Sequence, residues 1–390
     1  MKLLHVHDFF APGNSRAGFD LDRVLVRRGH QVHVLAAVSE RGPADGAEVE
    51  GVRFHTYPFR PDLSGRARYA WGVSENRGRF EALQRERRFD VLILNQPLCA
   101  AGILGAPAAR GVPWAYFFLS PWAAEWRIEH PDAGWFSRLL NEGFRNRLER
   151  RALQAAPRAF VASEFMRGRL LEHHPEIPVS RIDIIPGAVD LCRFRPDGPP
   201  AAARARFGIG PGPVVLTVRR MVERMGIDLL LRAASRVPGI ELVLGGDGPH
   251  RARLESLARE LGLRARFLGF VPDEDLPALY RSADLFVLPT RFLEGFGFVA
   301  IEAMACGTPA LGTPVGAIPE VLGPLGLLFR EPTEEAVAQG IRSFFGSRDA
   351  SLPARCREHV ASRYDLEAVG ALTEGLLERV IREGAGHGRG

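Results

Sequence analysis

The sequence predicts the α/β fold class, with two doubly wound, Rossmann-like domains that face each other across a cleft. Three observations support this prediction. The chain has 390 residues, a length that commonly forms two domains. Short, continuous apolar segments alternate with helical patterns, as in parallel sheets covered by helices on both faces. Proline and glycine become frequent at residues 195–200 and interrupt this alternation.

The first half opens with a β-α-β pattern. We expect a strand at Lys2–His7, a polar loop at 11–18, a helix at about Phe19–Arg28 and a strand at Gln31–Leu35. The loop would then lie at the carboxyl end of the first strand, where doubly wound sheets bind ligands. Further strands are expected at Val52–Tyr57, Asp90–Asn95, Pro113–Phe118, Arg158–Ala162 and Ile182–Ile185.

The alternation resumes in the second half, so we predict an N-terminal domain at 1–187 and a C-terminal domain at 188–365. Strands are expected at Val214–Val218, Glu241–Leu244, Arg266–Leu268, Leu285–Leu288 and Pro309–Leu311. Helices are expected at Ile227–Ser235, His250–Leu261, Asp275–Arg281 and Phe298–Cys306. A C-terminal helix at about 366–383 could pack back onto the first domain, and we expect the tail from Gly384 to be disordered.

The composition is that of an ordinary globular protein, with 46% hydrophobic and 25% charged residues. The 51 basic residues are scattered and balanced by 46 acidic ones, which argues against a nucleic-acid partner. Lys2 is the single lysine, so lysine is excluded as a catalytic base or as a ligand of phosphate.

The four cysteines are widely separated, which is typical of reduced thiols in a cytoplasmic protein. The N-terminus does not resemble a signal peptide, and no apolar run approaches the roughly 20 residues of a membrane span. The acidic run Asp273–Asp275 begins a predicted helix, so we interpret it as helix capping and not as a metal site. No histidine cluster has a zinc-ligand spacing, neither His5 with His7 nor His30 with His33, and we expect no cofactor and no essential metal.

Two carboxylates stand eight positions apart after the predicted strand Leu285–Leu288. Glu294 lies in a glycine-rich turn, and Glu302 lies inside the following helix. Glycines 295 and 297 allow the backbone to approach a ligand closely, and the helix start near Phe298 offers free N–H groups to a phosphate.

This arrangement resembles the E-x7-E signature of glycosyltransferase family 4, a family of retaining, nucleotide-sugar-dependent enzymes of the GT-B fold. Other segments agree with the resemblance in order along the chain: 218–228 with the donor-phosphate loop, 245–249 with the Gly-Asp-Gly-Pro turn, 269–280 with the segment that lines the nucleobase, and 313–320 with the closing stretch. Two positions depart from the family pattern. Met225 replaces the usual lysine, and Leu119 replaces the usual histidine. Arg219 or Arg224 could supply the missing charge, or the donor is held differently.

The resemblance implies transfer of a sugar from a nucleoside-diphosphate sugar to a hydroxyl acceptor, with retention, in glycan, glycolipid or cell-envelope polysaccharide synthesis. It assigns Arg220 to the leaving diphosphate and Glu294 to the donor sugar as the catalytic residues. The donor-binding residues that we predict are Arg219, Arg224, Gly246, Gly248, Val271, Gly295, Phe296, Gly297, Phe298 and Glu302, the last through the ribose. The alternatives are a non-catalytic nucleotide-sugar-binding partner subunit, or an epimerase or phosphorylase on the same fold.

The resemblance assigns the acceptor to the N-terminal domain. Polar and aromatic residues that follow its predicted strands are candidates for acceptor binding: Asn14, Ser15, Gly18, Asn95, Ser120 and Trp122, with Trp122 and Trp126 placed to stack on a sugar. The segment 135–151 is a basic amphipathic helix. It either packs on its own domain or contacts the inner face of the membrane, in which case a lipid-linked acceptor would be accessible.

Overall fold

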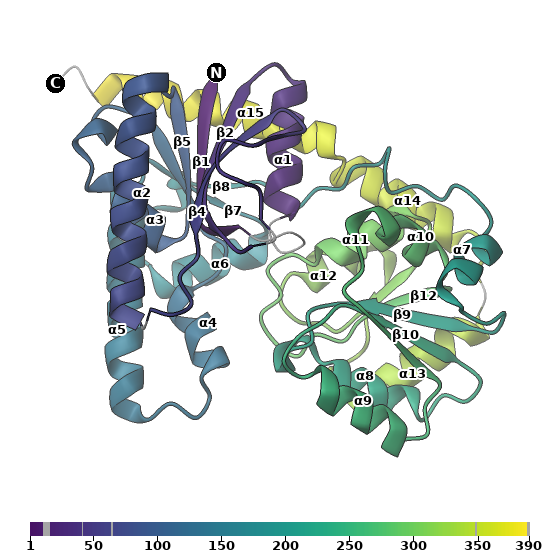
Figure 1. Cartoon of the computed structure of the whole chain (residues 1–390). Helices are drawn as coiled ribbons and strands as arrows, with labels where there is room; N and C mark the ends of the chain where they lie inside the picture. Colours follow the sequence, from purple (N-terminus) through teal and green to yellow (C-terminus); the bar gives the residue numbers. More distant parts are fainter. Residues whose placement is uncertain (11–15, 41, 64, 348, 388–390) are drawn as a thin grey trace. The chain divides into compact units, whose positions relative to one another are not determined.

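The computed structural model describes residues 1–10, 16–40, 42–63, 65–347 and 349–387 (Figure 1). The chain forms two compact units. Unit 1 consists of Met1–Pro186 together with the C-terminal segment from Glu367, and unit 2 consists of Gly187–Leu366. Each unit contains one twisted sheet between helices, because its strands are apolar on both faces and its helices are apolar on one.

Unit 1 contains an eight-stranded sheet in the order β3-β4-β2-β1-β5-β6-β7-β8. All neighbouring strands are parallel except the short β3, which pairs antiparallel with β4. The strand bounds are β1 Lys2–Phe10, β2 Gln31–Val38, β3 Glu48–Val49, β4 Val52–Pro58, β5 Val91–Asn95, β6 Trp114–Phe117, β7 Arg158–Val161 and β8 Ile182–Ile184. The predicted strands are confirmed, and β1 continues three residues beyond the predicted end at His7.

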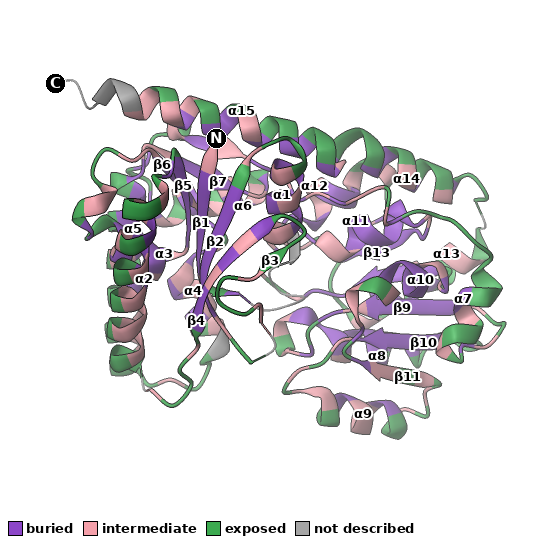
Figure 2. Cartoon of the chain, turned by 45° about the horizontal axis from the view of Figure 1, so that its top comes forward, coloured by how far each residue is buried: buried purple, intermediate pink, exposed green. Residues whose placement is uncertain are grey.

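The helices of unit 1 are α1 Arg16–Arg27, α2 Gly65–Arg87, α3 Pro97–Leu104, α4 Trp122–Glu129, α5 Trp135–Ala155, α6 Glu164–His173 and α15 Leu366–His387, with short 3-10 helices at Pro107–Ala109 and Val179–Arg181. Helices α2, α3, α5 and α6 contribute to one large apolar core with the sheet. The inner strands of the sheet are mostly buried, whereas the short edge strand β3 is exposed, and the helices expose their outer faces (Figure 2).

Helix α15 belongs to unit 1 although it is the last element of the chain. Its residues Leu376, Leu377 and Val380 are buried, and Glu374 accepts hydrogen bonds from Arg28 and His30, each at 2.7 Å. The helix continues to His387, so the predicted disorder from Gly384 is wrong for residues 384–387. The glycines there are accommodated because the helix rests on the body of unit 1 instead of standing alone.

Unit 2 contains a five-stranded parallel sheet in the order β11-β10-β9-β12-β13. Its strands are β9 Val214–Val218, β10 Glu241–Gly245, β11 Ala265–Gly269, β12 Leu285–Leu288 and β13 Ala310–Gly312. Its helices are α7 Pro200–Phe207, α8 Ile227–Ala234, α9 Arg251–Glu260, α10 Leu276–Arg281, α11 Phe298–Ala305, α12 Ile318–Leu322, α13 Glu334–Gly346 and α14 Leu352–Arg363, with 3-10 helices at Glu223–Met225, Asp273–Asp275 and Gly323–Leu325. Helices α8, α9 and α13 share one core cluster, on the face away from α10 and α11 (Figure 1).

All four cysteines are free thiols, as predicted; three are buried and Cys192 is exposed. In the part of the chain that the structure describes, no helix combines the length and the apolar character that crossing a bilayer requires.

Candidate active site

The predicted donor residues of unit 2 follow the carboxyl ends of its strands. The strand order reverses between β9 and β12, because β10 and β11 lie on one side and β13 on the other. Ligands of doubly wound sheets bind beside such a reversal. The loop after β9 begins with Arg219, and the loop after β12 contains Glu294.

Arg219 and Glu294 meet at this point and form a buried ion pair. The Nη2 atom of Arg219 donates to Oε2 of Glu294 at 2.5 Å, and the two side chains are only 5% and 11% exposed. Thr290 donates its hydroxyl to the same carboxylate oxygen at 3.1 Å, a contact that the sequence did not suggest. The Nη2 atom of Arg219 also lies 2.8 Å from the sulfur of Met225. The other terminal nitrogen, Nη1, is buried and has no hydrogen-bond partner among the described residues.

The two other predicted arginines have different surroundings. Arg220 is exposed, and no ion pair of its side chain is found in the described part of unit 2. It is therefore available to a ligand, but it is not the arginine that contacts Glu294. Arg224 donates from Nη1 to the carbonyl oxygen of Leu293 at 3.0 Å. Leu293 has a φ of 57°, so Arg224 stabilises a left-handed turn directly before Glu294.

Glycines bring the loops of the site into direct backbone contact. A Cβ atom at Gly226, whose φ is 66°, would lie 1.9 Å from the carbonyl oxygen of Pro289, so the loops after β9 and β12 could not approach as they do. A Cβ atom at Gly246 would similarly lie 2.1 Å from the carbonyl oxygen of Arg219. Gly248 packs against the backbone of Met221. The predicted donor glycines 246 and 248 therefore allow the loop after β10 to lie directly against the backbone of Arg219 and Met221 in the loop after β9.

Glu302 is buried in α11 and accepts a hydrogen bond of 2.6 Å from the hydroxyl of Tyr280. Tyr280 is fully buried, and its carbonyl oxygen accepts a hydrogen bond from Thr308 at 2.8 Å. No pattern in the sequence indicated this hydrogen bond of Tyr280. The carboxylate of Glu302 is thus held in one orientation by the helix α10.

The start of α11 has no side-chain cap. Gly297 is the residue before the helix, with a φ of 98°, and it lies between the loop of Glu294 and the half-buried Phe298. Gly295 is also half-buried, and Val271 is buried against Gly245. Phe296 is buried and packs on Tyr364 and Phe298 at ring distances of 5.3 and 5.1 Å. The side chain of Phe296 therefore lies in the apolar core, and its contact with the donor stays a prediction.

The acidic run Asp273–Asp275 forms a 3-10 turn before α10. Asp275 is the residue before that helix, but its side chain makes no capping hydrogen bond and pairs with Arg206 instead. The predicted hydrogen-bonding cap is wrong for Asp275, because an exposed arginine competes for the carboxylate. The acidic charge still lies at the start of the helix, where the dipole favours it.

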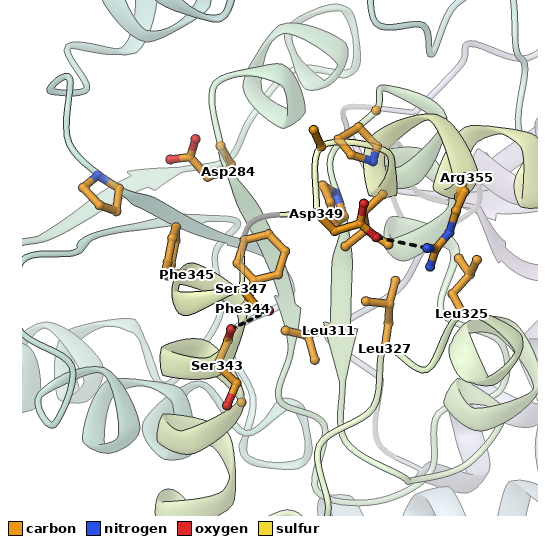
Figure 3. Close-up of a pocket in the computed structure, with 18 of the residues that line it drawn as sticks. Asp284, Leu311, Leu325, Leu327, Ser343, Phe344, Phe345, Ser347, Asp349 and Arg355 are labelled. Carbon is orange, nitrogen blue, oxygen red and sulfur yellow. Dashed lines mark hydrogen bonds and ion pairs between the residues drawn. The ribbon is translucent and has the colours of Figure 1, made fainter.

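A cavity of about 980 Å³ lies at the amino ends of the strands of unit 2, whereas the donor residues follow their carboxyl ends (Figure 3). Its lining includes residues that directly precede β9, β12 and β13, namely Pro213, Asp284 and Pro309, and the aromatic ring of Phe344. None of the predicted donor residues lines it. We therefore do not assign the cavity to the donor.

The candidate acceptor residues of unit 1 are mostly engaged with the protein. Asn14 and Ser15 lie outside the described residues. Gly18 is half-buried and lies beside the rings of His5 and His7. Asn95 is buried, with its Nδ2 atom 3.0 Å from Nδ1 of His7.

Ser120 and Trp122 are half-buried at the carboxyl edge of the sheet, after β6. The guanidinium carbon of Arg145 lies over the ring of Trp122, 4.8 Å from the ring centroid. Trp126 is buried and stacks on His130 at 4.7 Å, and its contact with a sugar stays a prediction. The guanidinium of Arg145, on α5, also lies 5.2 Å from the centroid of the Trp126 ring, so it contacts both indoles.

Asp8 is a residue of this edge that sequence reasoning missed. It lies within β1, and its Oδ1 atom accepts a hydrogen bond of 2.6 Å from the backbone N–H of Cys99 in α3. Burial raises the pKa of Asp8 from 3.8 to about 7, although the N–H of Cys99 opposes the shift. A carboxylate inside a predicted buried segment was the available signal.

The fold is that of the GT-B glycosyltransferases. Sucrose-phosphate synthase from Thermosynechococcus elongatus aligns with a TM-score of 0.84 at 23% identity, over 98% of this chain and 100% of that one. Anabaena HepE, solved in complex with UDP and glucose, aligns with a TM-score of 0.75 at 19% identity, over 97% and 100%.

Two family models match the sequence. "Glycosyltransferase Family 4" matches residues 11–193, and "Glycosyl transferases group 1" matches residues 202–363. The chain belongs to glycosyltransferase family 4.

Curated relatives carry related names. The D-inositol 3-phosphate glycosyltransferase of Mycobacterium sp. (strain JLS) is 36% identical over 225 residues, which is 55% of this chain and 50% of the relative. The GDP-mannose-dependent alpha-(1-6)-phosphatidylinositol monomannoside mannosyltransferase of Mycolicibacterium smegmatis is 38% identical over 159 residues, or 37% and 41%. The chain spans about half the length, or less, of these relatives.

Proposed function

We propose that the chain transfers a sugar from a nucleoside-diphosphate sugar to a hydroxyl acceptor, with retention at the anomeric carbon. The observation that carries this proposal is the unpartnered Nη1 atom of Arg219, buried beside Glu294 at the strand-order reversal of unit 2. Buried donors are almost always hydrogen-bonded. A phosphate or sugar oxygen of the donor would satisfy this nitrogen.

The contact between Arg219 and Met225 supports a relocated positive charge. Family 4 enzymes usually carry a lysine where this chain has Met225, and a thioether cannot neutralise a diphosphate. The guanidinium of Arg219 lies against the Met225 sulfur at 2.8 Å, so a cation is present where a lysine at 225 would extend. We propose that Arg219 replaces that lysine, and this weakens the case for an inactive, nucleotide-binding partner subunit.

We propose distinct roles for the remaining residues. Arg220 and the N-terminus of α11 would stabilise the negative charge that develops on the leaving diphosphate. Glu294 would orient the donor sugar, and Glu302 would accept hydrogen bonds from the ribose. Retention and a front-face route, in which the leaving phosphate takes the acceptor proton, rest on the family resemblance. These positive groups supply the charge that a metal would otherwise provide, so we propose no metal for the transfer.

Binding and transfer by the purified chain test the proposal. Thermal unfolding is recorded with UDP-, GDP-, ADP- and dTDP-sugars, because a ligand of the folded state raises the midpoint. We expect one nucleotide series to raise it for the wild type and for Arg253→Ala, an exposed arginine on α9. Arg220→Ala should lose roughly 100- to 1,000-fold in donor turnover. Proton NMR of the anomeric signal of the product measures retention.

Nucleotide binding without transfer or hydrolysis on any hydroxyl acceptor would favour the partner subunit. Isomerised donor would favour an epimerase, and turnover only with inorganic phosphate would favour a phosphorylase. Equal activity of the Arg220→Ala and Arg253→Ala variants would contradict the role of Arg220.

We further propose that the acceptor is membrane-linked and that α5 of unit 1 contacts an anionic bilayer. The first half of α5 exposes Trp135 by 78%, Leu139 by 63% and Phe136 by 59%, an unusual concentration of large apolar side chains. Exposed arginines, among them Arg147 and Arg151, follow on the same helix. This combination of an apolar stretch and positive charge is typical of helices that lie in a membrane interface.

Sedimentation with vesicles tests this contact. We expect the chain to bind phosphatidylglycerol vesicles more strongly than phosphatidylcholine vesicles, and the double variant Phe136→Gln/Leu139→Gln to lose most of that binding. The control is Leu372→Gln, which removes an exposed leucine from α15 of the same unit. Equal binding of both variants, or no binding of the wild type, would exclude α5 as the contact.

A further inference from the structure

The order of the strands in unit 1 reverses between β1 and β5. Strands β2 and β4 lie on the side of β1, and β6, β7 and β8 lie on the side of β5 (Figure 1). Doubly wound sheets bind ligands at the carboxyl ends of the strands beside such a reversal. The end of β1 and the start of the segment after β5 therefore form the part of unit 1 where a ligand is expected.

Asp8 lies at this end of β1 and is fixed against the helix that follows β5. Its Oδ1 atom accepts the 2.6 Å hydrogen bond from the N–H group of Cys99, the third residue of α3. Within the described residues, no basic side chain forms an ion pair with Asp8. The residue is half-buried, whereas Val6 and His7 before it are buried, so Asp8 is the first polar residue of the strand that a ligand could reach.

A carboxylate at this place determines which groups can bind beside it. The first N–H groups of a helix would otherwise attract an anion. Here Asp8 brings the protein's own negative charge to one of them, and this charge disfavours a second anion nearby. A group that donates a hydrogen bond, such as a sugar hydroxyl, is favoured instead, because an ionised carboxylate only accepts hydrogen bonds.

The end of β1 also contains an irregularity in its pairing with β2. His7 pairs with Ala36 and Phe10 pairs with Val38, so three steps along β1 match two steps along β2. One extra residue in a strand changes the direction in which the following side chains point, and such bulges are frequent beside active sites. The irregularity therefore changes the face to which the residue after Asp8 points.

Phe9 lies on the same face of the sheet as Asp8 for this reason. A regular strand would direct Phe9 to the face of α1, where Gly18 lies beside the ring of His7. The Phe9 ring instead packs on Phe59 at 5.0 Å, and Phe59 packs against the core cluster on the other face, the face of α3 and Cys99. Phe9 is 36% exposed, so an aromatic surface is available next to the carboxylate.

Gln96 has a strained backbone at the neighbouring strand end. It follows β5 directly, with a φ of 77° and a ψ of 152°, a conformation that is nearly restricted to glycine. Strain of this kind persists where the surrounding structure imposes it, and it clusters at ligand sites. Gln96 precedes α3, so the strained turn also fixes the helix whose N–H group holds Asp8.

We propose that Asp8 binds a hydroxyl group of a carbohydrate acceptor, with the ring of Phe9 against an apolar face of the sugar. A sugar carries hydroxyl groups at its edge and C–H groups on its faces, so a carboxylate beside an exposed aromatic ring matches both. The inference rests on the proposed sugar transfer, in which unit 1 holds the acceptor. It adds the chemical class of the acceptor group at this position, which is an uncharged hydrogen-bond donor and not a phosphate.

The test compares donor and acceptor use by the purified full chain. Transfer to the octyl glycosides of glucose, mannose and galactose is measured at pH 8, because burial raises the pKa of Asp8 to about 7. Asp8→Asn keeps an oxygen for the N–H group of Cys99 but removes the negative charge. We expect the KM for the acceptor to rise by at least about 10-fold, because a hydrogen bond to a charged group is lost. The KM for the donor and the rise of the unfolding midpoint with donor should not change.

Each variant has a matched control. Asp90 also accepts a 2.6 Å hydrogen bond from a backbone N–H group, that of Lys2, but at the amino ends of β1 and β5. Asp90→Asn should therefore leave the acceptor KM at the wild-type value. Phe9→Ala should raise that KM several-fold, and its control is Leu104→Ala, which removes a side chain of similar exposure, 37%, at the end of α3.

Acceptor analogues that each lack one hydroxyl group identify the contact. With the wild type, one analogue should lose about 10-fold in kcat/KM. With Asp8→Asn the same analogue should equal its parent, because the two changes remove the same interaction. Asp8→Ser, a second uncharged variant, should behave in the same way, and circular dichroism identifies a variant that does not fold.

Three results would overturn the inference. An acceptor KM of Asp8→Asn equal to that of the wild type, or an analogue that loses equally with both proteins, would exclude the contact while leaving the sugar transfer intact. Equal rises of the donor and acceptor KM would assign Asp8 to the stability of the fold. Donor binding by the wild type without transfer to any glycoside would favour the partner subunit, and would remove the acceptor on which the contact depends.

Discussion

Removal of the Glu294 side chain should destabilise unit 2 as well as inactivate it. In Glu294→Ala the guanidinium of Arg219 would remain buried, with the Met225 sulfur as its nearest neighbour. Breaking a buried ion pair by removing one partner costs about 3–5 kcal/mol. For a domain of this size each kcal/mol corresponds to roughly 2–4 °C, so the midpoint of thermal unfolding should fall by roughly 10 °C.

The assay is thermal and urea unfolding of the purified variant beside two comparisons. Arg220→Ala removes the neighbouring arginine, which is exposed, and its midpoint should stay within about 1 °C of wild type because surface charges contribute little. The double variant Arg219→Met/Glu294→Ala removes both charges and should recover much of the loss. A Glu294→Ala midpoint equal to wild type would refute the ion pair as a stabilising contact. If the double variant were at least as unstable as Glu294→Ala, the unpaired charge of Arg219 would not explain the loss of stability.

Three further predictions concern other contacts. Gly226→Ala should lower the free energy of unfolding by more than about 3 kcal/mol in urea, since its Cβ would lie 1.9 Å from a carbonyl oxygen. The control Gly198→Ala, where φ is 90° and the space is open, should lower it by about 1–2 kcal/mol. Equal losses would contradict the close approach at Gly226. Tyr280→Phe should cost about 1–3 kcal/mol in the same assay, because Glu302 loses a buried donor, and an unchanged midpoint would exclude that bond. Asp8 has a pKa of about 7 in the folded state and about 3.8 in the unfolded chain, so the folded state keeps its proton to higher pH. The contribution of Asp8 to the free energy of unfolding should therefore fall by on the order of 2 kcal/mol between pH 4 and pH 8. Asp8→Asn should flatten that part of the pH profile of urea unfolding.

Most of the fold was predictable because its strands are buried on both faces. Such strands appear as continuous apolar runs, and Val214–Val218 and Leu285–Leu288 were located without error. Strand ends were less accurate where polar residues continue a strand. In β1 the run stops at Asp8, yet the strand continues because its backbone pairs again with β2, Phe10 opposite Val38. The helical tail was missed because its stability comes from packing, which glycine content does not reveal.

The site was predictable as a set of loops but not as a set of contacts. Glycine spacing located the turn that contains Glu294 and the helix that contains Glu302. The choice between Arg219 and Arg220 depends on which way each side chain leaves the strand end, and adjacent residues point in opposite directions.

The position of α15 affects how the chain can be synthesised. Unit 2 is continuous in sequence, but unit 1 needs a helix that is translated after unit 2. All of unit 2 is therefore synthesised while helix α1 of unit 1, whose Val24 packs against Gly370 of α15, is still uncovered. Domains usually mature in the order of their synthesis. Here unit 1 is begun before unit 2 and completed after it, so a chain that stopped before α15 would leave apolar residues of unit 1 uncovered and accessible to chaperones.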